Sequence, residues 1–223
     1  MSSRPRVGLT QRVDDLADRG ERRDALDQSW ARGLAGLGMI AVPIPNHTDD
    51  AAAIVDALQL DLIILTGGND LAALPGATNA APERDRVEHG LLAAAAERAL
   101  PVLGVCRGMQ MMVHDAGGTL QRADGHVRTT HVLATAPSDS LPLRDGRSVN
   151  SFHDWTVTRD GLAPQFVAVA TAPDGTVEAI QHTALPHVAI MWHPERPDPT
   201  TGAPWTDDDL ALVRRMVCAG GRR

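Results

Sequence analysis

Short apolar runs alternate with amphipathic segments along the first half of the chain. Continuous apolar runs suit strands that are buried on both faces, as in a parallel sheet. The expected strands are Arg6–Thr10, Met39–Ile44, Leu60–Leu65 and Pro101–Val105. Helical spacing of apolar positions predicts helices over Arg22–Leu34, Asp49–Leu58, Glu83–Ala99 and Met109–Ala116. This alternation predicts an α/β fold built on a doubly wound, mostly parallel open sheet.

The pattern changes after Gly117-Gly118. Short β-like runs follow, separated by Pro, Asp and Gly, and they predict a small, partly antiparallel extension packed beside the main sheet. The runs are Val132–Ala136, Phe166–Thr171, Val177–Gln181 and Val188–Trp192. A closing amphipathic helix is expected over Asp207–Ala219. Residues 120–150 give no clear pattern. No repeat or linker divides the chain, so we expect one domain over residues 1–223.

Composition excludes several classes of protein. The 223 residues carry a formal net charge of −7, which argues against nucleic acid as a partner. No apolar run approaches the roughly 18 residues of a membrane span, and the N-terminus lacks the apolar core of a secretory signal. Cys106 and Cys218 make neither a disulfide framework nor a zinc-type pair. We expect a cytoplasmic protein without membrane contact, cofactor or metal.

The segment Gly104-Val-Cys-Arg-Gly108 carries the clearest chemistry. It is a G-x-C-x-G form of the nucleophile elbow, in which a strand turns sharply into a helix. The turn leaves no room for Cβ atoms beside the nucleophile, which explains both glycines. The helix N-terminus that follows would lower the pKa of the Cys106 thiol. The alternative is a buried structural cysteine at a glycine-rich turn.

A second motif, Met191-Trp-His-Pro-Glu195, ends a predicted strand near the C-terminus. A thiolate hydrolase needs an imidazole to move protons and a carboxylate to fix the tautomer of that imidazole. His193 and Glu195 lie two apart in an extended segment and project to the same side. The alternative is a surface turn with a chance histidine and glutamate.

Together these motifs resemble the class I glutamine amidotransferases, and within them the γ-glutamyl-γ-aminobutyrate hydrolase-like group of the peptidase C26 family. Further segments fall in the order which that group shows, and the resemblance covers roughly residues 6–200. They are Thr66-Gly-Gly-Asn-Asp70, Gly117-Gly-Thr-Leu120, Val149-Asn-Ser-Phe-His153 and Gly175-Thr-Val-Glu-Ala179. The resemblance implies a flavodoxin-like sheet and hydrolysis of a γ-glutamyl amide bond.

The resemblance also implies roles for individual residues. Cys106 attacks the γ-carbonyl and forms a glutamyl-thioester, His193 transfers protons, and Glu195 holds His193. Backbone N–H groups of Gly68 and Arg107 form the oxyanion hole. The glutamyl moiety would be bound by Gln110 and by the segment Ser151, Phe152 and His153.

Some segments are typical of a narrower group, namely Thr10-Gln-Arg12, Arg23-Asp-Ala-Leu26 with Trp30, Gly67-Gly-Asn-Asp-Leu71, Asn150-Ser-Phe-His153, and Ile190-Met-Trp-His193 with Glu195-Arg196. They resemble the γ-glutamyl-CDP-amidate hydrolases, which release glutamate from a group joined through nitrogen to a cytidine phosphate. A guanidinium can make two hydrogen bonds to phosphate oxygens, so Arg12, Arg107 and Arg196 are candidates for phosphate recognition. The alternative for each is a surface arginine or an ordinary ion pair. His126 and His131 lack a surrounding carboxylate or cysteine pattern, so no metal site is expected there.

Three functions remain open from the sequence. The first is a free-standing hydrolase whose partner is a small-molecule γ-glutamyl substrate. The second is a glutaminase component that delivers ammonia to a separate synthase, which is the only interpretation that needs a protein partner. The third is a catalytically inactive binding module, which the presence of all three triad residues disfavours. The sequence leaves a homodimer open.

Overall fold

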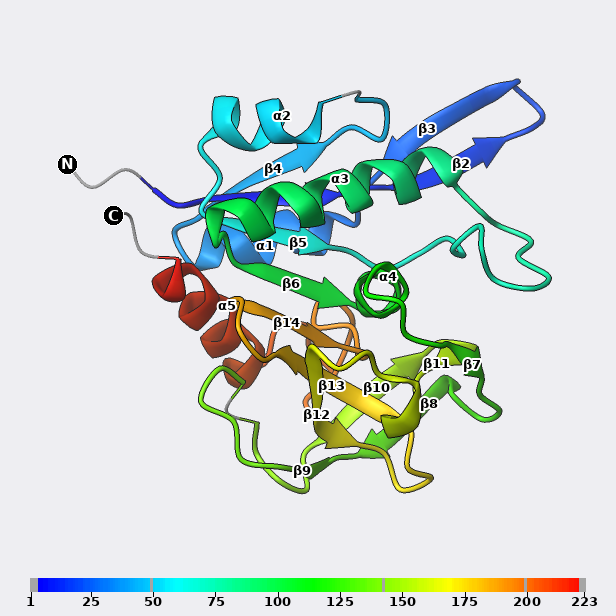
Figure 1. Ribbon diagram of the computed structural model, residues 1–223, viewed down its shortest axis with the longest axis vertical. Coiled ribbons are helices and arrows are strands. Elements are labelled where there is room, and N and C mark those ends of the chain that lie inside the picture. Colours follow the sequence, from blue (N-terminus) through cyan, green and yellow to red (C-terminus); the bar gives the residue numbers. More distant parts are fainter. Residues whose placement is uncertain (1–3, 49, 142, 199, 221–223) are drawn as a thin grey trace.

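A central sheet of eight strands organises the computed structural model, which describes residues 4–48, 50–141, 143–198 and 200–220 (Figure 1). In spatial order the strands are β4 (Ile40–Ile44), β1 (Arg6–Thr10), β5 (Leu62–Leu65), β6 (Val102–Val105), β14 (His187–Ile190), β13 (Val177–His182), β12 (Phe166–Thr171) and β9 (Ala134–Thr135). Strands β4 to β14 in this order pair in parallel, and the last three join in antiparallel fashion. The predicted sheet is confirmed, with its antiparallel extension continuous with the main sheet.

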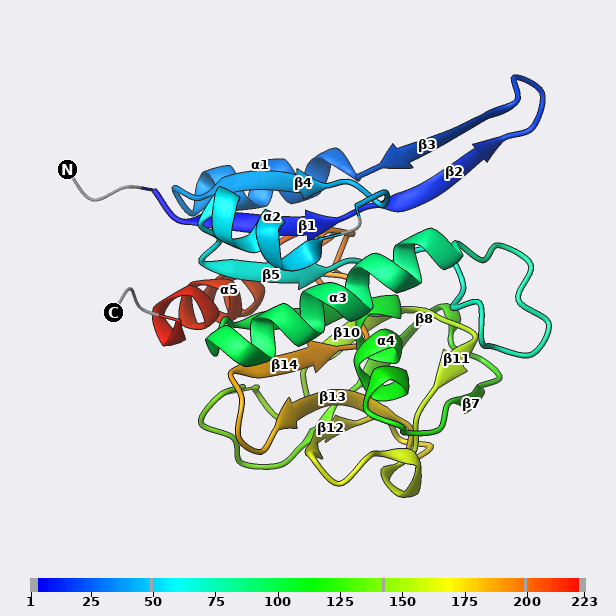
Figure 2. The same cartoon turned by 45° about the horizontal axis from the view of Figure 1, so that its top comes forward.

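Five helices cover the two faces of the sheet within the described residues. They are α1 (Gln28–Gly36), α2 (Ala51–Leu58), α3 (Pro82–Arg98), α4 (Arg107–Asp115) and α5 (Asp207–Ala219), besides a short 3-10 turn at Arg159–Gly161. Alternate residues of β5 enter different cores. Ile63 and Leu65 pack with α2, α3 and α4, whereas Leu62 and Ile64 pack with α1 and α5 (Figure 2). No helix among the described residues is long and apolar enough to cross a membrane.

The helix predicted over Arg22–Leu34 is wrong at its start. Strands β2 (Arg12–Leu16) and β3 (Glu21–Ala25) form a hairpin that projects from the sheet edge (Figure 1). Gly20, at φ +63°, closes the turn. The helix begins only after Asp27, whose side chain accepts a hydrogen bond from the backbone N–H of Ser29 at 2.7 Å. Turn and capping chemistry therefore override the helical spacing of Arg22–Leu26.

Smaller corrections concern the ends of other elements. The strand expected over Val132–Ala136 is split between β8 (Val127–Val132) and β9. Strand β8 pairs with β10 (Ser148–Phe152) in a separate two-stranded ribbon, and β7 (Gln121–Arg122) pairs with β11 (Trp155–Thr156). These pairs account for the segment that the sequence left without a pattern. Asp49, at the expected start of the second helix, lies outside the described residues.

Candidate active site

Cys106 occupies a strained turn between β6 and α4. Its backbone lies at φ 52° and ψ −105°, a conformation that residues other than glycine rarely adopt. Close packing enforces the turn. A Cβ on Gly108 would lie 2.1 Å from the carbonyl oxygen of Leu65, and one on Gly104 would lie 2.7 Å from the sulfur of Met112. The two predicted glycines thus allow the helix to start directly after the cysteine.

His193 and Glu195 reach the same edge of the sheet as Cys106. They follow β14, which pairs in parallel with β6, so both strands end side by side. His193 Nδ1 and Glu195 Oε1 lie 2.7 Å apart, and both side chains are buried. Gly67 makes room for the ring, since a Cβ there would lie 2.5 Å from His193 Cε1. The structure brings the three predicted triad residues together.

The electrostatics of Cys106 and His193 favour their ionised forms. Burial is the largest single influence on each and opposes its charge, but the favourable interactions of each group together outweigh it. The pKa of the Cys106 thiol is therefore lowered, chiefly by His193. Cys106 and Glu195 raise the pKa of His193 to about 9. Apart from this interaction with Cys106, His193 Nε2 has no hydrogen-bond partner among the described residues, so it is available to exchange a proton with a bound molecule.

Asn150, on β10, fixes the backbone of His193. Its Oδ1 accepts a hydrogen bond from the N–H of His193, and its Nδ2 donates to the carbonyl of His193, both at 2.9 Å. No role was predicted for this residue from the sequence, although it lies inside the Val149–His153 motif. Such a paired amide contact holds the strand end that carries the imidazole.

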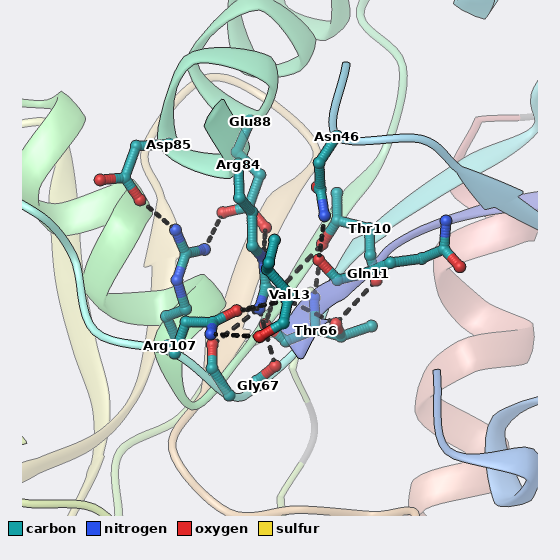
Figure 3. Close-up of polar contacts among 12 residues, drawn as sticks. Thr10, Gln11, Val13, Asn46, Thr66, Gly67, Arg84, Asp85, Glu88 and Arg107 are labelled. Atoms are coloured by element: carbon teal, nitrogen blue, oxygen red, sulfur yellow. Dashed lines mark hydrogen bonds and ion pairs between the residues drawn. The ribbon is translucent and has the colours of Figure 1, made fainter. Parts of the chain in front are cut away.

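A buried arginine holds the loop opposite the elbow (Figure 3). The Arg84 guanidinium donates to the carbonyl oxygens of Thr66, Gly67 and Gly68, the last at 2.7 Å. Its Nε donates to Glu88 Oε1 at 2.8 Å, and neither side chain is exposed. Burial, with repulsion from Arg107, lowers the pKa of Arg84 to about 10, and Glu88 opposes that fall. The arginine thereby fixes the loop that contains Gly68.

Arg107 joins the same network from the other side. Its guanidinium pairs with Glu88 and with Asp85, and the side chain is 1% exposed (Figure 3). The prediction that Arg107 recognises phosphate is therefore wrong, because its guanidinium is buried and its charge is compensated by Glu88 and Asp85. The sequence motifs do not include Arg84 or Glu88. Their i, i+4 spacing, next to apolar Val87 and Leu91 on the same helix, indicates an ion pair that faces the core.

Polar atoms of most residues predicted to bind substrate already contact protein groups. Gln110 Nε2 donates to the carbonyl of Trp155 at 3.0 Å, and the Ser151 hydroxyl donates to the carbonyl of His126 at 2.7 Å. His153 Nδ1 lies 3.1 Å from the carbonyl of Trp155. Phe152 instead packs its ring edge-on against His193, with ring centroids 5.9 Å apart.

Arg12 and Arg196 line one small pocket of about 70 Å³ together with Gly67, Gly68 and Glu195. The Arg196 guanidinium lies over the Phe152 ring, 4.4 Å from its centroid. Arg12 is half-exposed and bonds to Asp14 Oδ1 at 2.7 Å. Both predicted arginines therefore lie beside the triad. A larger hollow of about 630 Å³, around Gly146–Ser148 and Asp207–Asp208, is lined by none of these residues.

A parallel sheet that carries a cysteine elbow and a neighbouring histidine–glutamate pair is the arrangement of class I glutamine amidotransferases. Residues 5–195 match the Peptidase C26 family, and the chain belongs to that family. The resemblance inferred from the sequence is thereby confirmed, and the protein is a hydrolase.

Individual relatives carry both hydrolase and synthase names. The chain is 28% identical to the gamma-glutamyl-CDP-amidate hydrolase of Campylobacter jejuni, over 85% of this chain and 90% of that protein. It is 31% identical to anthranilate synthase component 2 of Mycobacterium tuberculosis, over 77% and 73%. A crystal structure of a glutamine amidotransferase from Thermotoga maritima has a TM-score of 0.65 at 14% identity, covering 87% of this chain and 77% of that one. This last match supports the fold.

Glu88→Gln should destabilise the protein strongly, because Arg84 and Arg107 would lose the carboxylate that compensates them. Removing one partner of a buried charge pair costs about 3–5 kcal/mol. Denaturant unfolding measures this loss. Asp56→Asn, which breaks the exposed pair with Arg98, is the control and should leave the unfolding midpoint nearly unchanged. Equal effects of the two substitutions would contradict the assigned role of Glu88.

Proposed function

We propose that this hydrolase cleaves a γ-glutamyl amide bond with Cys106 as nucleophile, His193 as acid and base, and Glu195 as the residue that orients His193. The observation that carries the proposal is the meeting of a strained, low-pKa cysteine with a glutamate-bound imidazole at adjacent strand ends. Family membership supports a γ-glutamyl substrate.

The reaction follows from this geometry. The Cys106 thiolate attacks the γ-carbonyl, and backbone N–H groups of Gly68 and Arg107 stabilise the oxyanion. Arg107 is the first residue of α4, so its N–H has no partner inside the helix. An oxyanion donor is worth about 3–4 kcal/mol in comparable sites. The imidazolium of His193 protonates the leaving nitrogen as the C–N bond breaks, which leaves a glutamyl-thioester.

The second half of the reaction returns the enzyme to its starting state. Neutral His193 accepts a proton from water as the water oxygen attacks the thioester. The C–S bond then breaks, glutamate leaves, and the Cys106 thiolate again faces an imidazolium. Throughout, Glu195 holds Nδ1–H and keeps Nε2 directed at the reacting atoms.

We assign the nitrogen of a nucleotide phosphoramidate as the preferred leaving group, with Gln110 and the Ser151–His153 segment at the glutamyl end. Arg12 and Arg196 supply two cationic groups in a pocket bounded by Gly68 and Glu195. The Campylobacter relative, named for a γ-glutamyl-CDP-amidate, supports this class of substrate. Phosphate oxygens would find bidentate donors there.

The alternative is a glutaminase component that passes ammonia to a synthase. The likeness to anthranilate synthase component 2 supports it. Assays on the isolated chain separate the two functions, since a coupled glutaminase is nearly silent without its partner. Turnover of γ-glutamyl substrates by the chain alone would support the hydrolase.

Cys106→Ala should abolish hydrolysis, with a loss of at least about 10³-fold in kcat, while circular dichroism and Tm remain close to wild type. Only the nucleophile is removed. Cys218→Ala is the matched control, because that thiol is exposed on α5 and should be dispensable. More than a few per cent of wild-type activity in Cys106→Ala, or inactivity of Cys218→Ala alone, would contradict the proposed mechanism.

The pH profile of kcat/KM should be bell-shaped. Activity rises as the Cys106 thiol ionises, below its ordinary pKa, and falls as His193 loses its proton near pH 9. Glu195→Gln removes the negative charge that helps raise the pKa of His193, so the alkaline limb should move to lower pH. It should also lower kcat more than it changes KM. Glu97→Gln, an exposed acid on α3, is the control. An unmoved alkaline limb in Glu195→Gln would show that Glu195 does not act through His193.

Arg12→Ala and Arg196→Ala should each lower kcat/KM for a γ-glutamyl nucleotide amidate by roughly ten- to a hundredfold. A charge-assisted hydrogen bond contributes about 1.5–3 kcal/mol. Hydrolysis of γ-glutamyl-γ-aminobutyrate, which has no phosphate, is the control. Arg12→Ala is the cleaner variant, because Arg196 also adds attraction to the Cys106 thiolate. Equal losses on both substrates would contradict a phosphate role.

A further inference from the structure

Three histidines and a glutamate gather where the β8–β10 ribbon meets the main sheet. His126 precedes β8, His131 lies on β8, His153 follows β10, and Glu178 lies on β13. One potential ligand atom from each lies within 4.8 Å of all the others. Strands β8 and β10 lie near β13 in Figure 1. Glu178 is far from His126 and His131 in the sequence, so sequence spacing does not reveal that a carboxylate joins the histidines.

The atoms that face one another in this cluster lack hydrogen-bond partners among the described residues. They are His126 Nδ1, His131 Nε2, His153 Nε2 and both carboxylate oxygens of Glu178. His126, His153 and Glu178 are 2%, 3% and 0% exposed, so bulk solvent does not reach them. His153 Nε2 and His126 Nδ1 lie 3.6 Å and 3.9 Å from Glu178 Oε1. Unpaired buried polar atoms are costly, and a shared ligand would satisfy all of them.

The outer contacts of two histidines fix their lone pairs toward the centre. His126 Nε2 lies 2.8 Å from Asp174 Oδ2, so it carries the proton and leaves Nδ1 as an acceptor. His153 Nδ1 donates to the carbonyl of Trp155, which directs Nε2 toward Glu178. Histidines that bind metal ions commonly donate their second N–H to a carboxylate or a backbone carbonyl in this way.

We propose that His126, His131, His153 and Glu178 bind one divalent transition-metal ion, with zinc as the best match. Three imidazole nitrogens and a carboxylate suit zinc, and four protein ligands make the closed shell of a structural site. Tetrahedral zinc separates its ligand atoms by about 3.3 Å, so the cluster needs a small contraction. His131 on β8 is only partly buried, unlike the other three residues, so it is the ligand that would move to close the shell.

The proposed ion would tie the β8–β10 ribbon to the main sheet. That ribbon carries Asn150, which holds the backbone of His193. The site uses none of the triad residues, but its ligand His153 interacts electrostatically with Cys106 and belongs to the segment proposed at the glutamyl end. Metal content and stability are therefore measured apart from catalysis.

The test titrates the full chain, stripped with a chelator, with Zn²⁺ alone and separately with Co²⁺. One ion per chain should bind, and bound Co²⁺ should show visible absorption without the thiolate charge-transfer band that Cys106 would add. Glu178→Gln and His131→Asn should each weaken Zn²⁺ binding by about tenfold or more, and Asp174→Asn by roughly 10- to 100-fold. His89→Asn, an exposed histidine on α3, is the matched control and should bind like wild type.

Glu178→Gln also separates metal binding from ordinary packing. In the metal-free protein this neutral isostere removes a buried carboxylate, so its Tm should equal or exceed that of wild type. With excess Zn²⁺, wild type should melt higher than the variant. The proposal is overturned if stripped wild type binds no Zn²⁺, or if binding is lost in Cys106→Ala and unchanged in His131→Asn. A lower Tm of metal-free Glu178→Gln, without zinc binding by wild type, would identify a His153–Glu178 ion pair instead.

Discussion

The Glu88 carboxylate lies between the buried guanidinium groups of Arg84 and Arg107, and both sides of the candidate site meet there. Arg84 holds the carbonyl oxygens of the Thr66–Gly68 loop, whereas Arg107 begins the helix that follows the cysteine. The three charges depend on one another, with Asp85 as a further partner of Arg107, because all three side chains are shielded from bulk solvent. Loop and elbow are therefore held in fixed relation to each other, as the oxyanion hole proposed for Gly68 and Arg107 requires.

Strain and charge at Cys106 depend on this fixed frame. A positive φ at a cysteine is unfavourable by itself, and it persists because close packing at Gly104 and Gly108 leaves the chain little alternative. Burial likewise disfavours a thiolate and an imidazolium separately, yet their attraction favours both together. Asn150 and Glu195 then hold His193 from its backbone and from its ring. The reactive pair is thus stabilised by its surroundings rather than by exposure to solvent.

Much of the fold and of the candidate site is predictable from the sequence, because many of their features depend on residues that are close together in the chain. Buried strands, the elbow and the histidine–glutamate pair each leave a contiguous pattern, and the structure brings them together. The hairpin before α1 was mistaken for helix, because helical spacing in Arg22–Leu26 competes with a turn at Gly20 that the pattern does not reveal. Contacts between segments that are distant in the sequence are harder still to predict. Arg84 with the Thr66–Gly68 loop, Asn150 with His193, and Glu178 with three histidines depend on tertiary folding, which single-sequence spacing does not encode.

The central claim is that a γ-glutamyl group passes through a covalent bond to Cys106. Acid quenching during turnover of a γ-glutamyl substrate, followed by peptide mass mapping, tests it directly. The peptide that contains Cys106 should carry the added mass of one glutamyl residue, labile to hydroxylamine as a thioester is. The peptide that contains Cys218 should carry no adduct. Steady turnover with an unmodified Cys106 peptide at every quench time, together with failure of a thiol-reactive glutamine analogue to label that residue, would contradict it.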